Sequence, residues 1–217
     1  MDTNTGFTLL ELFVMGGITM WPLTLFSIAA VAIVLERLIF FLYHDFKLDD
    51  LKEKVETAIQ NGNIAEAKEF LESQTKRRMG ARVLLTLVNR SDFSEYRLEK
   101  AVEAEAQSCI SSMETGTNFL TALGSISPLT GFLGTVTGMI GAFRSIAEAV
   151  DVNAQIVASG IYEALITTVY GLCIAIVAMV AHSLFTNYID KFASNAEAVC
   201  SDLIITLSET KSGKNAN

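Results

Sequence analysis

A single acidic residue stands inside one of the most apolar stretches of this sequence. Between Asp151 and Asp190, Glu163 is the only charged residue. If a helix starts at Asp151, the twelve residues to Glu163 span ~18 Å. A charge at the middle of a membrane costs on the order of 3 kcal/mol on insertion scales, so such a residue usually faces a cavity or the interior of a helix bundle. Glu163 is therefore a candidate for ion handling.

Hydroxyl groups follow Glu163 at helical spacing. Thr167 lies one turn further on, and Tyr170 lies almost directly above Glu163 two turns on, so the three would share one helix face. Thr168 points further round the helix. The alternative is a neutral Glu163 that hydrogen-bonds a Thr or Tyr and serves packing alone. The residues by themselves leave both roles open.

A second apolar stretch, residues 123–143, is rich in glycine and hydroxyl residues. Small residues three or four positions apart let helices approach closely in lipid. The glycines expected to pack in this way are Gly131, Gly134, Gly138 and Gly141, with Pro128 as the expected kink. A phosphate-binding glycine loop is excluded, because no Lys follows the glycines and the segment is apolar.

These two polar-lined helices would have to meet to be useful. Thr135 and Thr137 on the glycine-rich helix, beside Glu163 on the other, would give a narrow hydroxyl-lined path with one titratable group. Such a path suits protons or sodium ions better than large solutes. Because three helices cannot enclose a pore, a homo-oligomeric bundle is expected.

The distribution of charge predicts three membrane spans. Hydrophobic residues make up 51% of the chain, and no charged residue occurs between Glu11 and Glu36 or between Glu114 and Arg144. A span takes ~20 predominantly apolar residues. We therefore predict an all-α integral membrane protein with transmembrane helices over residues 17–43, 119–146 and 156–185. A soluble helical protein would show a polar face on each helix, and these windows show none.

Lysine and arginine counts predict the orientation. The segment 1–16 has none, the region 44–118 has eleven, the link 147–155 has none and the tail 186–217 has three. By the positive-inside rule, 1–16 and 147–155 would be periplasmic, whereas 44–118 and 186–217 would be cytoplasmic. The N-terminus lacks the positive region of a signal peptide, so the first span is expected to be retained.

The region 44–118 shows helical patterning with recognisable ends. Asn61 and Gly62 interrupt one helix, as a C-terminal cap would. Asp92 and Glu95 resemble a capping box, from which one long helix is predicted to run into the second span near Asn118. The basic cluster Lys76–Arg78 is interpreted as a solvated or lipid-facing surface and not as a binding site for a specific ligand.

The remaining charged and reactive residues argue against chemistry at a classical active site. Glu36 and Arg37, near the end of the first span, are interpreted as an interfacial charge pair that extends toward the headgroups or forms an interhelical salt bridge. The cysteines, 109, 173 and 200, form no CxxC pair. No nucleophile–base pairing appears either. We expect neither an enzyme nor a bound metal or cofactor, and the lack of a basic run argues against nucleic acid.

Four segments together resemble a known family. They are Gly17–Leu23 (GITMWPL), Leu35–Leu38 (LERL), Pro128–Met139 (PLTGFLGTVTGM) and Gly160–Thr168 (GIYEALITT). In order and topology they are similar to the ExbB/TolQ/MotA family of proton-channel proteins, and the similarity is closest to ExbB. MotA-type members have four spans and a larger cytoplasmic domain, so they fit less well.

The resemblance implies a subunit of a bacterial inner-membrane motor driven by proton motive force. Five such chains would form a pentamer around ExbD-like single-span proteins, whose transmembrane Asp carries the proton, and the work would pass to a TonB-like envelope protein for transport across the outer membrane. Family pore residues correspond to Thr135, Glu163 and Thr168, whereas helical geometry favours Thr167. The alternatives are a TolQ-like or gliding-type motor subunit, or a membrane scaffold in which Glu163 is structural.

Overall fold

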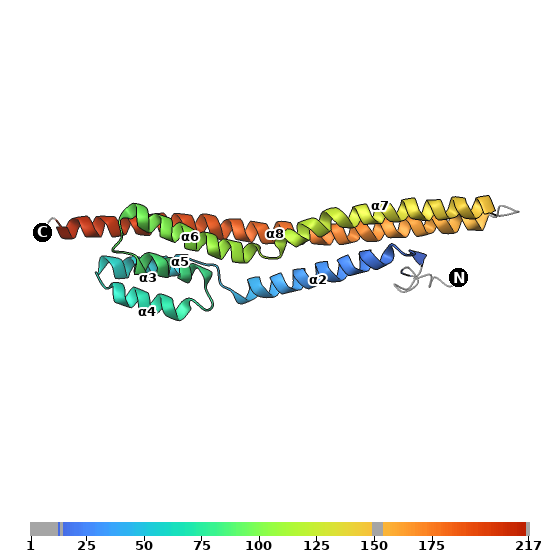
Figure 1. Ribbon diagram of the computed structural model, residues 1–217. Coiled ribbons are helices and arrows are strands. Elements are labelled where there is room, and N and C mark those ends of the chain that lie inside the picture. The colour runs from blue at the N-terminus through green and yellow to red at the C-terminus, as the bar shows by residue number, and fades with distance from the viewer. Residues whose placement is uncertain (1–12, 14, 149–153, 216–217) are drawn as a thin grey trace. The chain divides into compact units, whose positions relative to one another are not determined.

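The computed structural model describes residue 13, residues 15–148 and residues 154–215. Within these residues the chain is helical and has no strand beyond one isolated bridge between Asp45 and Arg78. The predicted all-α fold is confirmed. The helices are α2 (Met20–Tyr43), α3 (Asp49–Gln60), α4 (Ile64–Gln74), α5 (Met79–Asn89), α6 (Glu95–Glu114), α7 (Thr117–Glu148) and α8 (Ala154–Asn215) (Figure 1).

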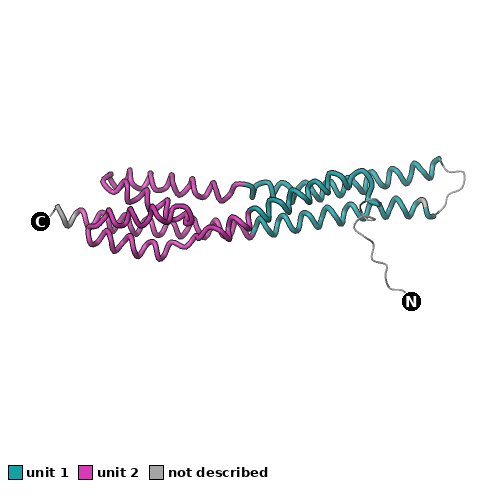
Figure 2. Tube along the Cα trace, turned by 90° about the horizontal axis from the view of Figure 1, so that it is seen from below, with its two compact units in different colours: residues 1–36, 116–183 teal, residues 37–115, 184–217 magenta. Residues whose placement is uncertain are grey.

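Two compact units divide the chain (Figure 2). Unit 1 comprises residues 1–36 and 116–183, and unit 2 comprises residues 37–115 and 184–217. Three stretches are long and apolar enough to cross a membrane: Met20–Tyr43, a window within Glu95–Glu148 and a window within Val157–Lys211. The chain is thus an integral membrane protein with three transmembrane helices, as predicted. Residues 1–12 and 149–153, which hold most of the two predicted periplasmic segments, lie outside the described residues.

Unit 1 exposes the apolar surface that a membrane helix needs. Large side chains such as Trp21, Phe132, Phe143 and Val180 remain at least half exposed. In water such surface would be costly, whereas in lipid, or against another subunit, it is favourable. The interior of this unit is lined instead by small residues, described below.

Unit 2 is built like a soluble helical domain. Its helices are amphipathic, and their apolar faces meet in one core that includes Leu51, Val55, Leu84, Leu98 and Leu203. Two cysteines lie in that core. Burial raises the pKa of the Cys200 thiol to about 12 and also raises the pKa of the Cys109 thiol. Both thiols are free, and they serve as small apolar side chains.

The predicted continuous helix from residue 92 into the second span is wrong. The helix α6 begins at Glu95 after the N-cap Ser94, without a capping hydrogen bond, and ends at Glu114. Thr115 is extended with ψ 125°, and Gly116 has φ 87°, a left-handed conformation that glycine adopts readily. A new helix, α7, then starts at Thr117. The break separates an amphipathic helix from an apolar one.

Arg37 belongs to the pair interpreted from the sequence as extending toward the headgroups or forming an interhelical salt bridge, and in the structure it turns into the protein. Its side chain is buried, and the guanidinium donates hydrogen bonds to the carbonyl oxygens of Ser112 (3.3 Å) and Met113 (3.4 Å). It also lies 4.8 Å from the centre of the Phe40 ring. The last carbonyls of a helix lack backbone partners and carry partial negative charge, so the end of α6 suits a cation. Arg37 therefore closes the end that the break at Gly116 creates, while Glu36 is exposed.

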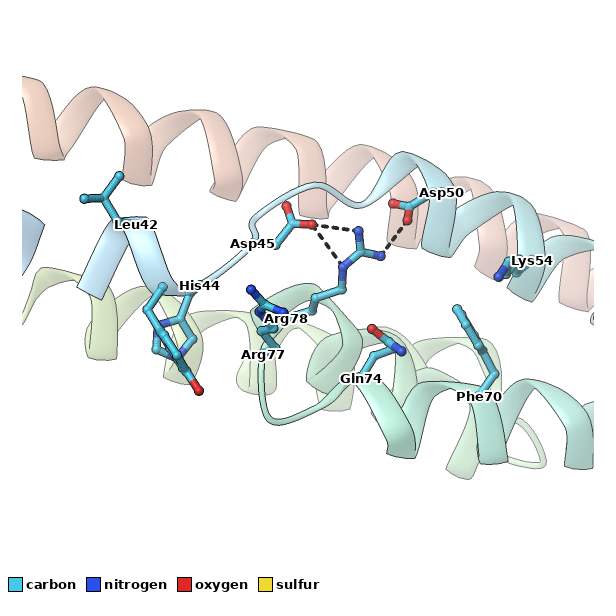
Figure 3. A pocket seen from close by; sticks show the side chains of 10 residues that line it. Leu42, His44, Asp45, Asp50, Lys54, Phe70, Gln74, Arg77 and Arg78 are labelled. Carbon is cyan, nitrogen blue, oxygen red and sulfur yellow. Dashed lines mark hydrogen bonds and ion pairs between the residues drawn. The ribbon is translucent and has the colours of Figure 1, made fainter. Parts of the chain in front are cut away.

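Arg78 joins the chain segment after α2 to the start of α5. Its guanidinium donates to Asp45 from Nε (3.1 Å) and Nη2 (2.7 Å), and to Asp50 from Nη1 (2.6 Å) (Figure 3). Burial raises the pKa of Asp45, but hydrogen bonds from Lys47 and Arg78 outweigh it, so the net direction is downward. The hydrogen bond from Arg78 lowers the pKa of Asp50. Both carboxylates thus favour the folded state in their ionised form.

Arg78→Gln is expected to destabilise unit 2 in a pH-dependent way. Groups with a lowered pKa stabilise the fold above their ordinary value, here 3.8, and that contribution is lost as the pH falls below it. The variant should therefore lose about 1 kcal/mol at neutral pH, and the difference from the parent should shrink toward pH 3. Urea unfolding of the detergent-solubilised chain, followed by circular dichroism, measures both.

Arg97→Gln is the matched control for this test, since Arg97 is exposed and forms no ion pair among the described residues. It should leave the unfolding midpoint unchanged at both pH values. A deficit of Arg78→Gln that persists undiminished at low pH would contradict the charge-pair explanation.

Candidate ion pathway

The glycines of α7 form the contact with α8 in unit 1. A methyl group added at Gly131 would lie 2.8 Å from the carbonyl oxygen of Thr167, and one at Gly138 would lie 3.1 Å from the carbonyl oxygen of Gly160. At Gly134 it would lie 2.6 Å from Cβ of Thr167. A methyl group at Gly131 or Gly134 would force a neighbouring group to shift, and at Gly138 it would make a tight contact. The two helices therefore pack through small residues, as their spacing suggests.

Gly141 and Pro128 differ from the other predicted packing residues. Among the described residues nothing lies within 4 Å of a methyl group added at Gly141. Pro128 is half-buried inside α7, which continues through it. Its neighbour Ser127 is fully buried, and the Ser127 hydroxyl has no hydrogen-bond partner among the described residues.

Two threonines of α8 converge on one carbonyl group of α7. Thr167 is fully buried, and its hydroxyl donates to the carbonyl oxygens of Ala164 (2.8 Å) and Gly131 (3.3 Å). The half-buried Thr168 donates to the same Gly131 oxygen (3.3 Å). Helical geometry favoured Thr167 as the neighbour of Glu163, whereas the family resemblance pointed to Thr168. In the structure both hydroxyls donate to the same carbonyl oxygen. Because Gly131 has no side chain, both hydroxyls can reach it.

Glu163 lies against the segment that leads into α2. The side chain is half-buried, and a methyl group added at Gly17 would overlap its carboxylate. Gly17 has φ 65°, a backbone conformation suited to glycine. Glycine is therefore favoured here for two reasons, its backbone conformation and the space that the Glu163 side chain occupies. One turn along α8 from Glu163, the buried Thr167 faces Gly134, as does the hydroxyl of Thr19. Glu163 therefore lies at the rim of a small polar cluster formed by α7, α8 and the segment that leads into α2.

Gly17 and Thr19 were missed by sequence reasoning as members of this site. The signal was the pair Gly16-Gly17 at the start of the predicted first span, but nothing in the local sequence links this pair to residue 163. Thr135, predicted to lie on the ion path, is half-buried and donates to the Phe132 carbonyl of its own helix (2.7 Å). No hydrogen bond joins it to Glu163, Thr167 or Thr168 within the described chain.

Comparison with known proteins places this geometry in context. The model of the MotA/TolQ/ExbB proton channel family matches residues 64–198, which include Gly131, Glu163, Thr167 and Thr168. The match covers more than half of the chain. The chain belongs to this family. Its resemblance to the ExbB/TolQ/MotA proteins, drawn above from four short segments, is thereby confirmed.

Several curated relatives support the same conclusion. The chain is 33% identical over 195 residues to the ExbB-like 1 biopolymer transport protein of Synechocystis sp., covering 86% of this chain and 75% of that protein. It is 34% identical over 110 residues to the biopolymer transport protein ExbB of Salmonella typhimurium, covering 51% of this chain and 43% of that protein. With the Tol-Pal system protein TolQ of Haemophilus influenzae it shares 38% identity over 96 residues, 39% of this chain and 42% of that protein.

Membership of the MotA/TolQ/ExbB family gives the general function. Family and relatives together make the chain a proton-channel subunit of an envelope motor, and a multi-pass protein of the bacterial inner membrane. The match with Salmonella ExbB spans less than half of that protein. The system energised and the partners are therefore treated as proposals.

Proposed function

We propose that this chain is the ExbB-like pore-forming subunit of a motor that uses proton motive force to energise TonB-dependent transport across the outer membrane. The observation that carries the proposal is Glu163, a half-buried carboxylate against Gly17, with the buried hydroxyl of Thr167 one turn away. A titratable group beside hydroxyls inside an apolar helix bundle is suited to passing protons. One proton crossing 100 mV supplies ~2.3 kcal/mol.

The proposed assembly is a pentamer around an ExbD-like single-span protein with a transmembrane Asp. Its N-terminus is periplasmic, unit 2 is cytoplasmic and a TonB-like protein receives the work. The exposed apolar faces of α7 support an oligomer, since Leu129, Phe132 and Phe143 are each more than 60% exposed in the described chain. Thr135 and Gly141 are proposed to face neighbouring subunits or the partner, because among the described residues Thr135 forms no hydrogen bond with α8 and nothing lies within 4 Å of a methyl group added at Gly141.

The test is extraction from native membranes in mild detergent, followed by native mass measurement and identification of co-purifying chains. Five copies with a small single-span protein that carries a membrane-embedded Asp are expected. A homo-oligomer without such a partner after gentle extraction would contradict the motor proposal and favour a scaffold.

A TolQ-like role is the second candidate, because TolQ of Pseudomonas aeruginosa is 42% identical to this chain over 74 residues. The same purification separates the two roles through the envelope proteins that the partner contacts. Deletion of the gene offers an independent readout. Loss of growth on substrates that need active outer-membrane uptake favours the ExbB-like role, whereas outer-membrane leakage with normal uptake favours the TolQ-like role.

A further inference from the structure

A polar hollow lies in unit 2 where α2 ends. The last residues of α2, Leu42 and Tyr43, line one side of it, and the connection between α4 and α5 lines the other with Arg77 and Arg78 (Figure 3). Lys54 of α3 and Gln74 of α4 complete the polar part of the wall. The basic cluster Lys76–Arg78, which the ion pathway does not use, thus meets the end of a membrane-spanning helix.

Both acidic residues that line the hollow already form ion pairs within the protein. Arg78 pairs with both acidic lining residues, Asp45 (2.7 Å) and Asp50 (2.6 Å). Arg77 is exposed and forms no ion pair among the described residues, and its backbone carbonyl is held by the amide of Asp45 (3.1 Å). Lys54 lies 4.3 Å from the centre of the Phe70 ring and likewise pairs with no acid in the described chain. The charged side chains of Arg77 and Lys54 are therefore available to bind an anionic ligand.

The apolar side of the hollow is largely exposed in the described chain. Leu42 is 78% exposed and Tyr43 is 62% exposed, although both belong to a helix apolar enough to span a membrane. Tyrosine at the end of such a helix marks the level of the lipid headgroups. Cationic side chains without an acidic partner, next to the apolar end of a helix, suit a ligand that has an anionic head and an apolar tail.

We propose that this hollow binds the phosphodiester headgroup of an anionic membrane lipid. The Arg77 guanidinium offers a planar pair of N–H donors that matches phosphate oxygens, and the Lys54 ammonium adds a second charge. The amide of Gln74 is a further donor on the same wall. Leu42 and Tyr43 contact the acyl chains. A free phosphate shares the head chemistry but gains nothing from the apolar side.

The test compares lipid retention by the full-length chain, purified with any natural partners. Wild-type and variant proteins are placed in phosphatidylcholine nanodiscs with increasing phosphatidylglycerol, extracted gently and weighed by native mass spectrometry. Arg77→Gln is expected to weaken phosphatidylglycerol binding roughly tenfold, the loss of about one charge-assisted hydrogen bond. Arg77→Lys keeps the charge but lacks the planar pair of N–H donors. It should bind phosphatidylglycerol more weakly than the parent and more strongly than Arg77→Gln.

Arg90→Gln is the matched control. Arg90 is an exposed arginine at the opposite end of α5, stacked 5.9 Å from the Phe93 ring centre, and it does not line the hollow. It should retain lipid like the parent. Equal retention by parent and Arg77→Gln, or an equal loss in Arg90→Gln, would overturn the proposal.

Inorganic phosphate distinguishes the two sources of the anion. If phosphate binds in an Arg77-dependent way while phosphatidylglycerol does not, the lipid assignment is wrong. Displacement of phosphatidylglycerol only by another anionic lipid supports it. Circular dichroism confirms that each variant is folded before binding is compared. The measurement needs no proton flux, so its failure leaves the motor proposal intact, and failure of the motor proposal leaves this site intact.

Discussion

Glu163→Gln is expected to reduce proton flux roughly hundredfold while the complex still assembles. The amide has nearly the shape of the carboxyl group, so its contact with Gly17 and the packing of α8 should persist. What is lost is a group that can alternate between neutral and ionised forms. Without this carboxylate, a proton that crosses the span meets the ~3 kcal/mol cost of placing a charge in the membrane as an added energy barrier. The rate of proton flux then falls about a hundredfold, since each 1.36 kcal/mol of barrier is a factor of ten.

The measurement is dye-reported acidification of proteoliposomes that contain the chain and its co-purified partner. Glu148→Gln is the matched control, because Glu148 is an exposed carboxylate at the end of α7, paired with Arg144 (2.9 Å). It should conduct like the parent. Normal flux and normal envelope function in Glu163→Gln would show that Glu163 is structural, and the scaffold alternative would then be preferred.

Gly131→Ala is expected to cost about 1–3 kcal/mol of stability, the usual effect of overpacking. The added methyl group would lie 2.8 Å from the carbonyl oxygen of Thr167 and 3.1 Å from Cα of Thr168. Both are backbone atoms, so no side chain can turn away, and α8 must move. That movement would also lengthen the hydrogen bonds that Thr167 and Thr168 donate to the Gly131 carbonyl.

Gly141→Ala is the matched control, with the same substitution in the same helix. Its methyl group would meet no atom of the described residues within 4 Å. Replacing glycine by alanine inside a helix gains up to about 1 kcal/mol of helix propensity. Thermal unfolding of chains dissociated in detergent should therefore place Gly131→Ala below the parent and Gly141→Ala at or above it. An unchanged melting temperature for Gly131→Ala would contradict the close packing of α7 on α8.

Gly141→Ala carries further information in the intact complex. If a neighbouring subunit packs against the open face of α7, the same substitution should lower the stability of the assembly but not of the dissociated chain. The difference between the two melting experiments therefore reports on the subunit interface.

Much of this protein can be predicted from local sequence. Absence of charge over ~20 residues requires a membrane span, and glycines three or four apart require a close helix neighbour. A lone carboxyl in such a span marks a functional position. For these reasons the three spans and the all-α fold follow from composition and spacing, whereas the family follows from the resemblance of four short segments to known members. Asn61 and Gly62 similarly mark a helix end, which the structure places at Gln60, with Gly62 at φ 72°.

Other features depend on residues far apart in the chain. The break between α6 and α7 was missed because the helical pattern of residues 98–113 continues across it, and one glycine in an apolar helix is usually tolerated. Arg37 turns to the end of α6 because that break frees carbonyl groups 75 residues away in sequence. A local charge pattern therefore predicted the presence of Arg37 at the interface but not its partner.

The same separation holds at the candidate site. Residue types and helical spacing determined that Glu163, Thr167 and Thr168 would lie near one another on a membrane helix. Only the tertiary structure decided that Gly17 would face the Glu163 carboxylate and that both threonines would bond one carbonyl of Gly131. Helix periodicity specifies which residues share a face, whereas the register between helices depends on side-chain packing along their whole length.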